Sequence, residues 1–246
     1  MSSSSKFTRE GVREYEKRRY RGLDQRIVHA REIKLIRKML ALVDADRVVC
    51  DDQVDRVDRV VRRLALDLPC GYGRFTSMLR ERGFNVVSAD LSIEMARRAA
   101  ESATINPQDS GGRTPGDGLG PGTWFPALAA DACRLPFQPG IFDLVFSIRF
   151  FHHVHTPEGR AAILREFSRV SSEYTVVSFY RANGLHAVQR RLRRVFGKSR
   201  TNIKMVEAGV FEKAAGEAGF KIVRILPLFR GIHAYHLALL RKEGTG

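Results

Sequence analysis

The sequence predicts an α/β fold: a doubly wound, mostly parallel seven-stranded sheet with helices on both faces. Short apolar runs alternate with segments of helical periodicity, as in chains whose parallel strands are joined by crossover helices. The first such run, "RLALDLP", is followed by a turn with glycines at 71 and 73. Two apolar runs near the end of the chain, 220–229 and 235–242, predict a closing antiparallel pair.

The composition is that of a globular protein, with 246 residues, 43% hydrophobic and 28% charged. No run approaches the roughly 18 apolar residues that span a bilayer, and the start "MSSSSKFTRE" lacks an apolar signal core. Cys50, Cys70 and Cys133 lie far apart, without a CxxC or Cys/His pairing. We therefore expect a reduced, cytoplasmic protein without a structural zinc site.

A net charge of +15 is the unusual total. It indicates anionic partners, such as nucleic acid, a phosphorylated substrate or an anionic membrane surface. The alternative is an arginine-rich overall composition without a specific partner, since charge bears on association and not on the fold.

Before the first strand, the periodicity predicts helices over 7–42 and 52–61, which together form an N-terminal helical cap over residues 1–61. The remaining residues, 62–246, form the second unit. Its elements follow in order as strand 63–69, helix 74–83, strand 85–92, helix 92–103 capped by Ser92, strand and turn 127–137, strand 142–151, helix 156–170 opened by Thr156 and Pro157, strand 174–180, and helix 205–219.

Two segments interrupt this alternation. Residues 105–126 hold six glycines and four prolines, which predicts a flexible surface loop, either a tolerated insertion or a gating segment. Residues 181–204, after the fifth strand, carry arginines around an apolar helical stripe and predict a basic lid. A cap helix packed by that stripe, with solvated arginines, is the alternative.

The ligand of such a sheet lies at the carboxyl ends of the strands, beside the turn "CGYGRF". A P-loop is excluded because no GK[ST] follows Gly71, and the dinucleotide fingerprint is incomplete because Thr76 stands where its third glycine belongs. Asp67 further distinguishes between the possible ligands. Its carboxylate would repel a pyrophosphate but attract the α-ammonium of a methionine group.

Four segments, in register, carry a resemblance to a known family. "LDLPCGYGR", "VVSADLS", "AADACRLPF" and "FDLVFSIRFFHHV" resemble the motifs of class I S-adenosylmethionine-dependent methyltransferases, of the small-molecule, ubiquinone-biosynthesis-like type. The resemblance covers about residues 62–180. It implies the Rossmann-like methyltransferase fold, S-adenosyl-L-methionine as cofactor, and methyl transfer as the reaction.

The resemblance also implies roles for individual residues. Asp67 is expected near the methionine ammonium, and Asp90 at the ribose hydroxyls with Leu91 against the adenine. Asp131 is expected to accept a hydrogen bond from the adenine amino group while Ala132 offers its backbone N–H. The other expected cofactor-binding residues are Cys70, Gly71, Gly73 and Ser147.

The acceptor side is expected just after the fourth strand. His152 is the first candidate for a general base, followed by His153, with Arg149 also among the catalytic candidates. The segment "SIRFFHHV" contains no acid, so we expect no metal. The [DNS]-P-P-[YFW] motif of adenine-N6 methylation is absent.

Several functions remain open. The first is methylation of a small-molecule or lipid-linked, anionic acceptor, in the cytoplasm or at the membrane periphery. The second is RNA methylation with the 181–204 arginines on phosphates, although few aromatic residues interleave with them. A dinucleotide-binding oxidoreductase and a non-catalytic scaffold are minor alternatives.

Overall fold

The computed structural model describes residues 11, 23–51, 63–105, 127–181, 205–229 and 234–244, with the side chains of 23, 24, 46–51 and 102–105 left out. Four expectations of the sequence lie wholly or largely outside these residues. They are the start of the N-terminal helix before residue 23, the 52–61 helix, the 105–126 loop beyond Ile105 and the basic 181–204 stretch beyond Arg181.

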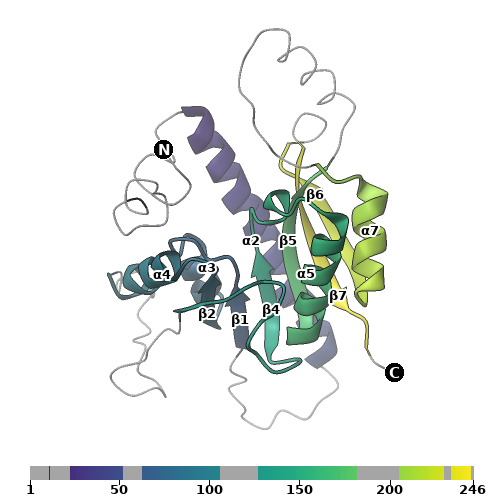
Figure 1. Ribbon diagram of the computed structural model, residues 1–246, viewed down its shortest axis with the longest axis horizontal. Helices are drawn as coiled ribbons and strands as arrows, with labels where there is room; N and C mark the ends of the chain where they lie inside the picture. Colours follow the sequence, from purple (N-terminus) through teal and green to yellow (C-terminus); the bar gives the residue numbers. More distant parts are fainter. Residues whose placement is uncertain are drawn as a thin grey trace.

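A seven-stranded sheet forms the middle of the described part of the chain (Figure 1), in the order β3-β2-β1-β4-β5-β7-β6. The strands are β1 (Arg63–Asp67), β2 (Phe84–Asp90), β3 (Ala127–Ala129), β4 (Phe142–Ser147), β5 (Ser171–Tyr180), β6 (Phe220–Pro227) and β7 (Tyr235–Lys242). The helices are α2 (Leu23–Asp51), α3 (Thr76–Glu81), α4 (Ile93–Ile105), α5 (Pro157–Val170) and α7 (Ala208–Glu217), with the 3-10 turn η3 (Phe151–His153).

The strand directions confirm the predicted doubly wound sheet. Strands β1 to β5 are all parallel to one another, whereas β7 runs antiparallel to both β5 and β6. The chain starts in the centre at β1, moves outward to β3 and then returns to β4 on the other side. This reversal between β1 and β4 is the switch point at which such sheets bind ligands.

Helices cover both faces of the sheet, with α2 behind it and α5 and α7 in front in the view of Figure 1. Successive strand residues point to opposite faces, so Leu144 packs in one hydrophobic cluster and Val145 in the other. One cluster joins the sheet to α2 and α3, and the other joins it to α5 and α7. Because both faces are covered, the central strands are apolar throughout rather than alternating.

Helix α2 is longer at its end than the sequence predicted. The expected break after residue 42 is wrong, because the helix continues to Asp51. No glycine or proline lies between 43 and 51 to end it. Its buried stripe consists of Glu32, Ile36, Met39, Leu40 and Val43, which recur at helical spacing and face the sheet.

Two predicted helix starts are confirmed. The Ser92 hydroxyl accepts a hydrogen bond from the Met95 N–H at 3.4 Å, and the Thr156 hydroxyl accepts one from the Gly159 N–H at 3.1 Å before Pro157. None of the helices in the described ranges is long and apolar enough to cross a membrane.

Candidate active site

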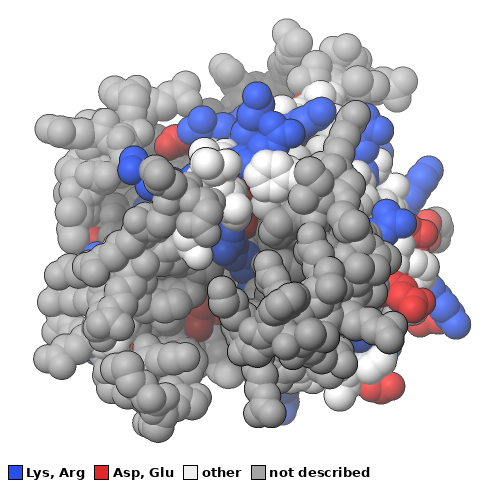
Figure 2. All heavy atoms as spheres, turned by 90° about the horizontal axis from the view of Figure 1, so that it is seen from above, with Lys and Arg blue, Asp and Glu red and all other residues white. Residues whose placement is uncertain are grey.

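The predicted site residues meet along one edge of the sheet because parallel strands end on the same side. Asp67, Asp90 and Ser147 are the last residues of β1, β2 and β4, and Ala129 ends β3 just before Asp131. This is the upper edge of the sheet in Figure 1, which Figure 2 shows from above. The topology thus gathers residues that are up to 80 positions apart in the sequence.

The segment 68–75, called here the glycine loop, is tied to the strands on both sides of β1. The Leu68 N–H donates to the Phe146 carbonyl at 2.9 Å, and the Cys70 N–H donates to the Ala89 carbonyl at 2.8 Å. The Gly71 N–H donates to Asp90 Oδ2 at 3.0 Å. These bonds fix the loop across the switch point.

The two glycines of this loop are required for different physical reasons. Both adopt positive φ, +56° at Gly71 and +82° at Gly73. A Cβ at Gly73 would lie 3.0 Å from the Ala99 Cα, so this residue permits close packing of the loop on α4. A Cβ at Gly71 would meet no atom within 4 Å. Only Gly71 therefore leaves its outer side open to a ligand.

Asp67 is a buried carboxyl beneath this loop, 2% exposed. The Thr76 hydroxyl donates to its Oδ2 at 2.8 Å. Burial, reinforced by the neighbouring charge of Asp90, raises the pKa of Asp67 to about 7, against the lowering effect of the Thr76 hydrogen bond. A cation bound next to Asp67 would favour its ionised form.

Asp90 holds the turn after β2, with Oδ1 accepting the Ser92 N–H at 2.9 Å in addition to the bond from Gly71. Burial raises the pKa of this carboxyl, although its backbone hydrogen bonds oppose the shift. Next to it, the Leu91 side chain is 77% exposed. An apolar side chain that is exposed at the ligand-binding edge of the sheet is suited to cover a flat apolar group.

Ser147 and the turn after β3 complete the cofactor side. The Ser147 hydroxyl is fully buried and has no hydrogen-bond partner among the described residues. Asp131 is exposed, and its Oδ1 accepts the Cys133 N–H at 2.9 Å, while Ala132 is buried. With the open side of Gly71 and the exposed Leu91, the unpaired Ser147 hydroxyl fits a bound cofactor along this edge.

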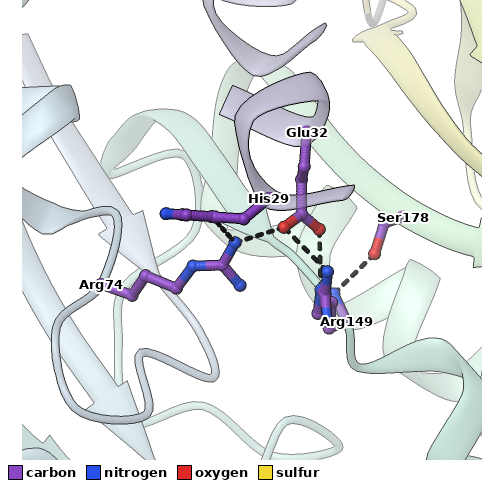
Figure 3. A network of polar contacts seen from close by, with 5 residues as sticks. All are labelled: His29, Glu32, Arg74, Arg149 and Ser178. Carbon is purple, nitrogen blue, oxygen red and sulfur yellow. Dashed lines mark hydrogen bonds and ion pairs between the residues drawn. The ribbon is translucent and has the colours of Figure 1, made fainter. Parts of the chain in front are cut away.

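Arg149 lies two residues beyond β4 and has a left-handed backbone, with φ of 59°. Non-glycine residues rarely adopt this conformation, and its N–H donates to the Ser178 hydroxyl at 2.5 Å. Its guanidinium forms two hydrogen bonds to the Glu32 carboxylate, at 2.7 and 3.0 Å (Figure 3). Burial alone would lower the pKa of Arg149, but Glu32 outweighs this and raises it.

The other members of this network were not predicted from the sequence. Glu32 also pairs with Arg74 of the glycine loop, and the Arg74 guanidinium contacts His29. A signal was present, because Glu32 lies four residues before Ile36 in the apolar stripe of α2. A carboxylate at a core position of a helix indicates a cationic partner.

His152 and His153 lie in η3 and belong to a row of rings. The ring centroids of His152 and His153 are 3.9 Å apart, those of His152 and Tyr180 5.1 Å, and those of Tyr180 and Tyr235 5.3 Å. The Arg149 guanidinium lies 5.8 Å from the centroid of the Tyr235 ring. We call these four rings the aromatic wall. It connects both predicted histidines, through Tyr180, with the ring that lies beside Arg149.

Within the described residues, no three His, Cys, Asp or Glu side chains form a group that could hold a metal ion.

Comparison with known proteins identifies the fold and the cofactor. A family model described as a methyltransferase domain matches residues 66–173, which include the glycine loop, Asp90 and the aromatic wall histidines. No curated protein matches the sequence.

Solved structures resemble the whole chain. Magnesium protoporphyrin IX methyltransferase from Synechocystis PCC 6803, with bound S-adenosylhomocysteine, is 16% identical with a TM-score of 0.68, covering 98% of each chain. A SAM-dependent methyltransferase from Methanosarcina mazei is 19% identical with a TM-score of 0.56, covering 77% of this chain and 99% of its own. The 1,6-didemethyltoxoflavin-N1-methyltransferase of Burkholderia thailandensis is 17% identical with a TM-score of 0.50, covering 74% and 72%.

The predicted fold class and cofactor are confirmed, and the dinucleotide alternative is not favoured by any of these matches. The chain carries a methyltransferase domain over residues 66–173, and its fold is that of class I S-adenosylmethionine-dependent methyltransferases.

Proposed function

We propose that this enzyme methylates a small-molecule or lipid-linked, anionic acceptor held between the glycine loop and the aromatic wall. The observation that carries this proposal is the wall itself, in which three adjoining pairs of rings have centroid spacings of 3.9, 5.1 and 5.3 Å beside Arg149. Tyr235 is buried, but His153 is exposed and His152 and Tyr180 are partly exposed, so these three rings offer a surface for a flat organic acceptor. Residues 62–246 would form the catalytic unit, with 1–61 as its cap and 181–204 as its lid.

The cofactor side follows from the charges along the sheet edge. Asp67 would lie near the methionine ammonium, Asp90 would accept hydrogen bonds from the ribose, and Leu91 would cover the adenine, with Asp131 and Ala132 at its amino edge. Gly71 would allow close backbone approach, with Cys70, Gly73 and Ser147 around it. When bound, S-adenosylmethionine supplies a methyl group activated by its sulfonium.

The protein's own contribution is then to position the acceptor and to accept a proton. Holding the acceptor atom about 3 to 3.5 Å from the methyl carbon accounts for much of the barrier reduction in such a transfer. His152, in contact with Tyr180 and His153 in the wall, is the candidate base if the acceptor atom loses a proton. Replacing it with alanine should then lower kcat about 100-fold and alter the pH–rate profile.

The solved relatives support the small-molecule class through what their names say. One acts on magnesium protoporphyrin IX and another on 1,6-didemethyltoxoflavin, both small organic molecules. The excess of positive charge supports an anionic acceptor, and Lys and Arg side chains gather in the upper part of the view in Figure 2. RNA is the second candidate, favoured only by the net charge of +15.

The test uses radiolabelled methyl donor and cell extract, separated after reaction into small-molecule, lipid and RNA fractions. We expect label in an organic small-molecule or lipid fraction, with His152→Ala as the control that lowers it. Label confined to RNA, with binding that weakens steeply as salt rises, would replace the proposal by the second candidate.

A further inference from the structure

A carboxylate occupies a core position of helix α2. Glu32 is fully buried and continues the stripe of Ile36, Met39, Leu40 and Val43 that packs on the sheet. An ionised carboxylate in such a position is costly unless it is paired and hydrogen-bonded. An apolar residue there would pack the helix as well, so packing alone does not explain the glutamate.

Its two guanidinium partners come from the two segments that form the site (Figure 3). Arg74 follows Gly73 in the glycine loop, and Arg149 forms the strained turn after β4. Arg149 binds both carboxylate oxygens, at 2.7 and 3.0 Å, while Arg74 binds one of them. One side chain of α2 therefore joins the cofactor side of the site to the acceptor side.

The charges around Glu32 favour its ionised form. Burial alone would raise the pKa of Glu32, but the hydrogen bonds and charge of Arg149, together with the charge of Arg74, lower it below its ordinary value. Burial, with the charge of Glu32 next in size, raises the pKa of the neighbouring Tyr235 hydroxyl well above its usual range, so that it stays protonated beside the carboxylate.

We propose that Glu32 is a positioning residue, which sets the glycine loop against the turn after β4 so that the cofactor is bound in register with the acceptor pocket. It touches neither the cofactor nor the acceptor, and it acts through Arg74 and Arg149. The proposal rests on cofactor binding and holds for any acceptor.

The same helix provides a matched control at the opposite edge of the sheet. Asp44 also bridges two arginines, with Oδ1 2.8 Å from Arg63 and Oδ2 2.7 Å from Arg82. Arg63 begins β1 and Arg82 precedes β2, so this bridge lies at the amino ends of the strands. Removing either bridge would loosen the docking of helix α2 on the sheet. Only removal of the Glu32 bridge should change the site.

The experiment compares Glu32→Gln and Asp44→Asn in the full chain. S-adenosylhomocysteine is titrated by calorimetry, unfolding is followed in denaturant, and amide hydrogen exchange is measured for peptides covering 68–76 and 148–154. For Glu32→Gln we expect at least a tenfold loss of affinity and faster exchange in both peptides. For Asp44→Asn we expect affinity within twofold of the wild type and unchanged exchange there.

A second pair of variants tests whether Glu32 acts through Arg74. This pair also replaces Glu32→Gln if that variant fails to fold. Arg74→Gln alone should weaken affinity by a similar factor, and Glu32→Asp, with a shorter but still charged side chain, should lose less than Glu32→Gln. If Glu32→Asp and Arg74→Gln both bind S-adenosylhomocysteine with wild-type affinity, the proposal is overturned. Equal affinity losses in Glu32→Gln and Asp44→Asn would do the same, because the role would then be structural only. Failure of the wild type to bind S-adenosylhomocysteine would instead contradict the assignment of the cofactor.

Discussion

At the scale of single residues, the site is a set of carboxyl groups whose protonation depends on what lies beside them. Asp67 and Asp90 end neighbouring strands, and each has its pKa raised by burial. A buried acid with a pKa near neutrality responds to a cationic ligand within the ordinary pH range. We therefore expect cofactor binding to depend on pH.

We expect affinity for S-adenosylhomocysteine to rise between pH 6 and pH 8, since Asp67 must lose its proton to attract the ammonium group and has a pKa of about 7. Calorimetry at several pH values measures this, and Asp67→Asn should bind weakly with little dependence on pH. The sign for stability is opposite. The folded pKa lies above the unfolded value, so the contribution of Asp67 to unliganded stability is present below about pH 4 and lost as pH rises to about 7. A flat affinity profile in the wild type would remove Asp67 from the ammonium site.

Asp90→Ala should weaken binding of S-adenosylhomocysteine by about 1.5–3 kcal/mol, the worth of hydrogen bonds to a charged group. The same carboxylate holds the Gly71 N–H at 3.0 Å, so part of the loss would come from a looser glycine loop. Glu94→Ala, which removes a partly exposed carboxylate of α4 paired with Arg97, is the control. Equal affinity in both variants would show that Asp90 does not bind the ribose.

At the scale of elements, the glycine loop separates two requirements that the sequence combines. Gly71 and Gly73 stand in one short motif, yet one faces open space and the other faces the backbone of α4. The spacing of the motif does not distinguish them, because the distance to Ala99 depends on how α4 packs.

Gly71→Ala and Gly73→Ala should therefore have different effects. Both place a side chain at positive φ, which costs about 1–2 kcal/mol, but Gly73→Ala adds an overlap with Ala99 at 3.0 Å and should destabilise the fold by a further 1 kcal/mol or so. Gly71→Ala should instead lose more cofactor affinity than stability. Denaturant unfolding and calorimetry measure the two quantities, and the reverse order would contradict this division of roles.

Helix α2 shows the same limit of local patterns. Its periodicity predicted a helix, but not its end at Asp51, and the purpose of Glu32 depended on partners at Arg74 and Arg149. Those residues are 42 and 117 positions away in the sequence. Local periodicity carries no information at that separation.

At the scale of the whole molecule, positive charge and the aromatic wall make different predictions about the acceptor. A net charge of +15 attracts any polyanion through long-range forces, which salt screens beyond about 10 Å at 0.1 M. The proposed contact of the wall with an acceptor acts at short range and should depend little on salt. We expect the KM for the acceptor to rise with ionic strength far less steeply than binding to RNA would.

A variant with four arginines replaced by glutamine tests the role of the positive charge separately from that of the aromatic wall. The four residues are Arg190, Arg191, Arg193 and Arg194. If the 181–204 stretch is a lid for an anionic acceptor, KM should rise while the affinity for S-adenosylhomocysteine stays the same. Steady-state kinetics and calorimetry on one preparation measure both. An unchanged KM would make these arginines a solvated face of a cap.

The sequence by itself determined the order of strands and helices, the sheet with its switch point, and the run of acids and glycines at that point. The first two follow from local spacing and from the rule that parallel strands end on one side, and the expected methyl-donor role of the acids and glycines follows from the family resemblance. The tertiary structure alone decided that Glu32 pairs with two arginines, that Gly73 serves packing while Gly71 faces outward, and that four rings form a row that ends beside Arg149. These are contacts between segments far apart in the chain, and their energies depend on distances that no sequence pattern specifies.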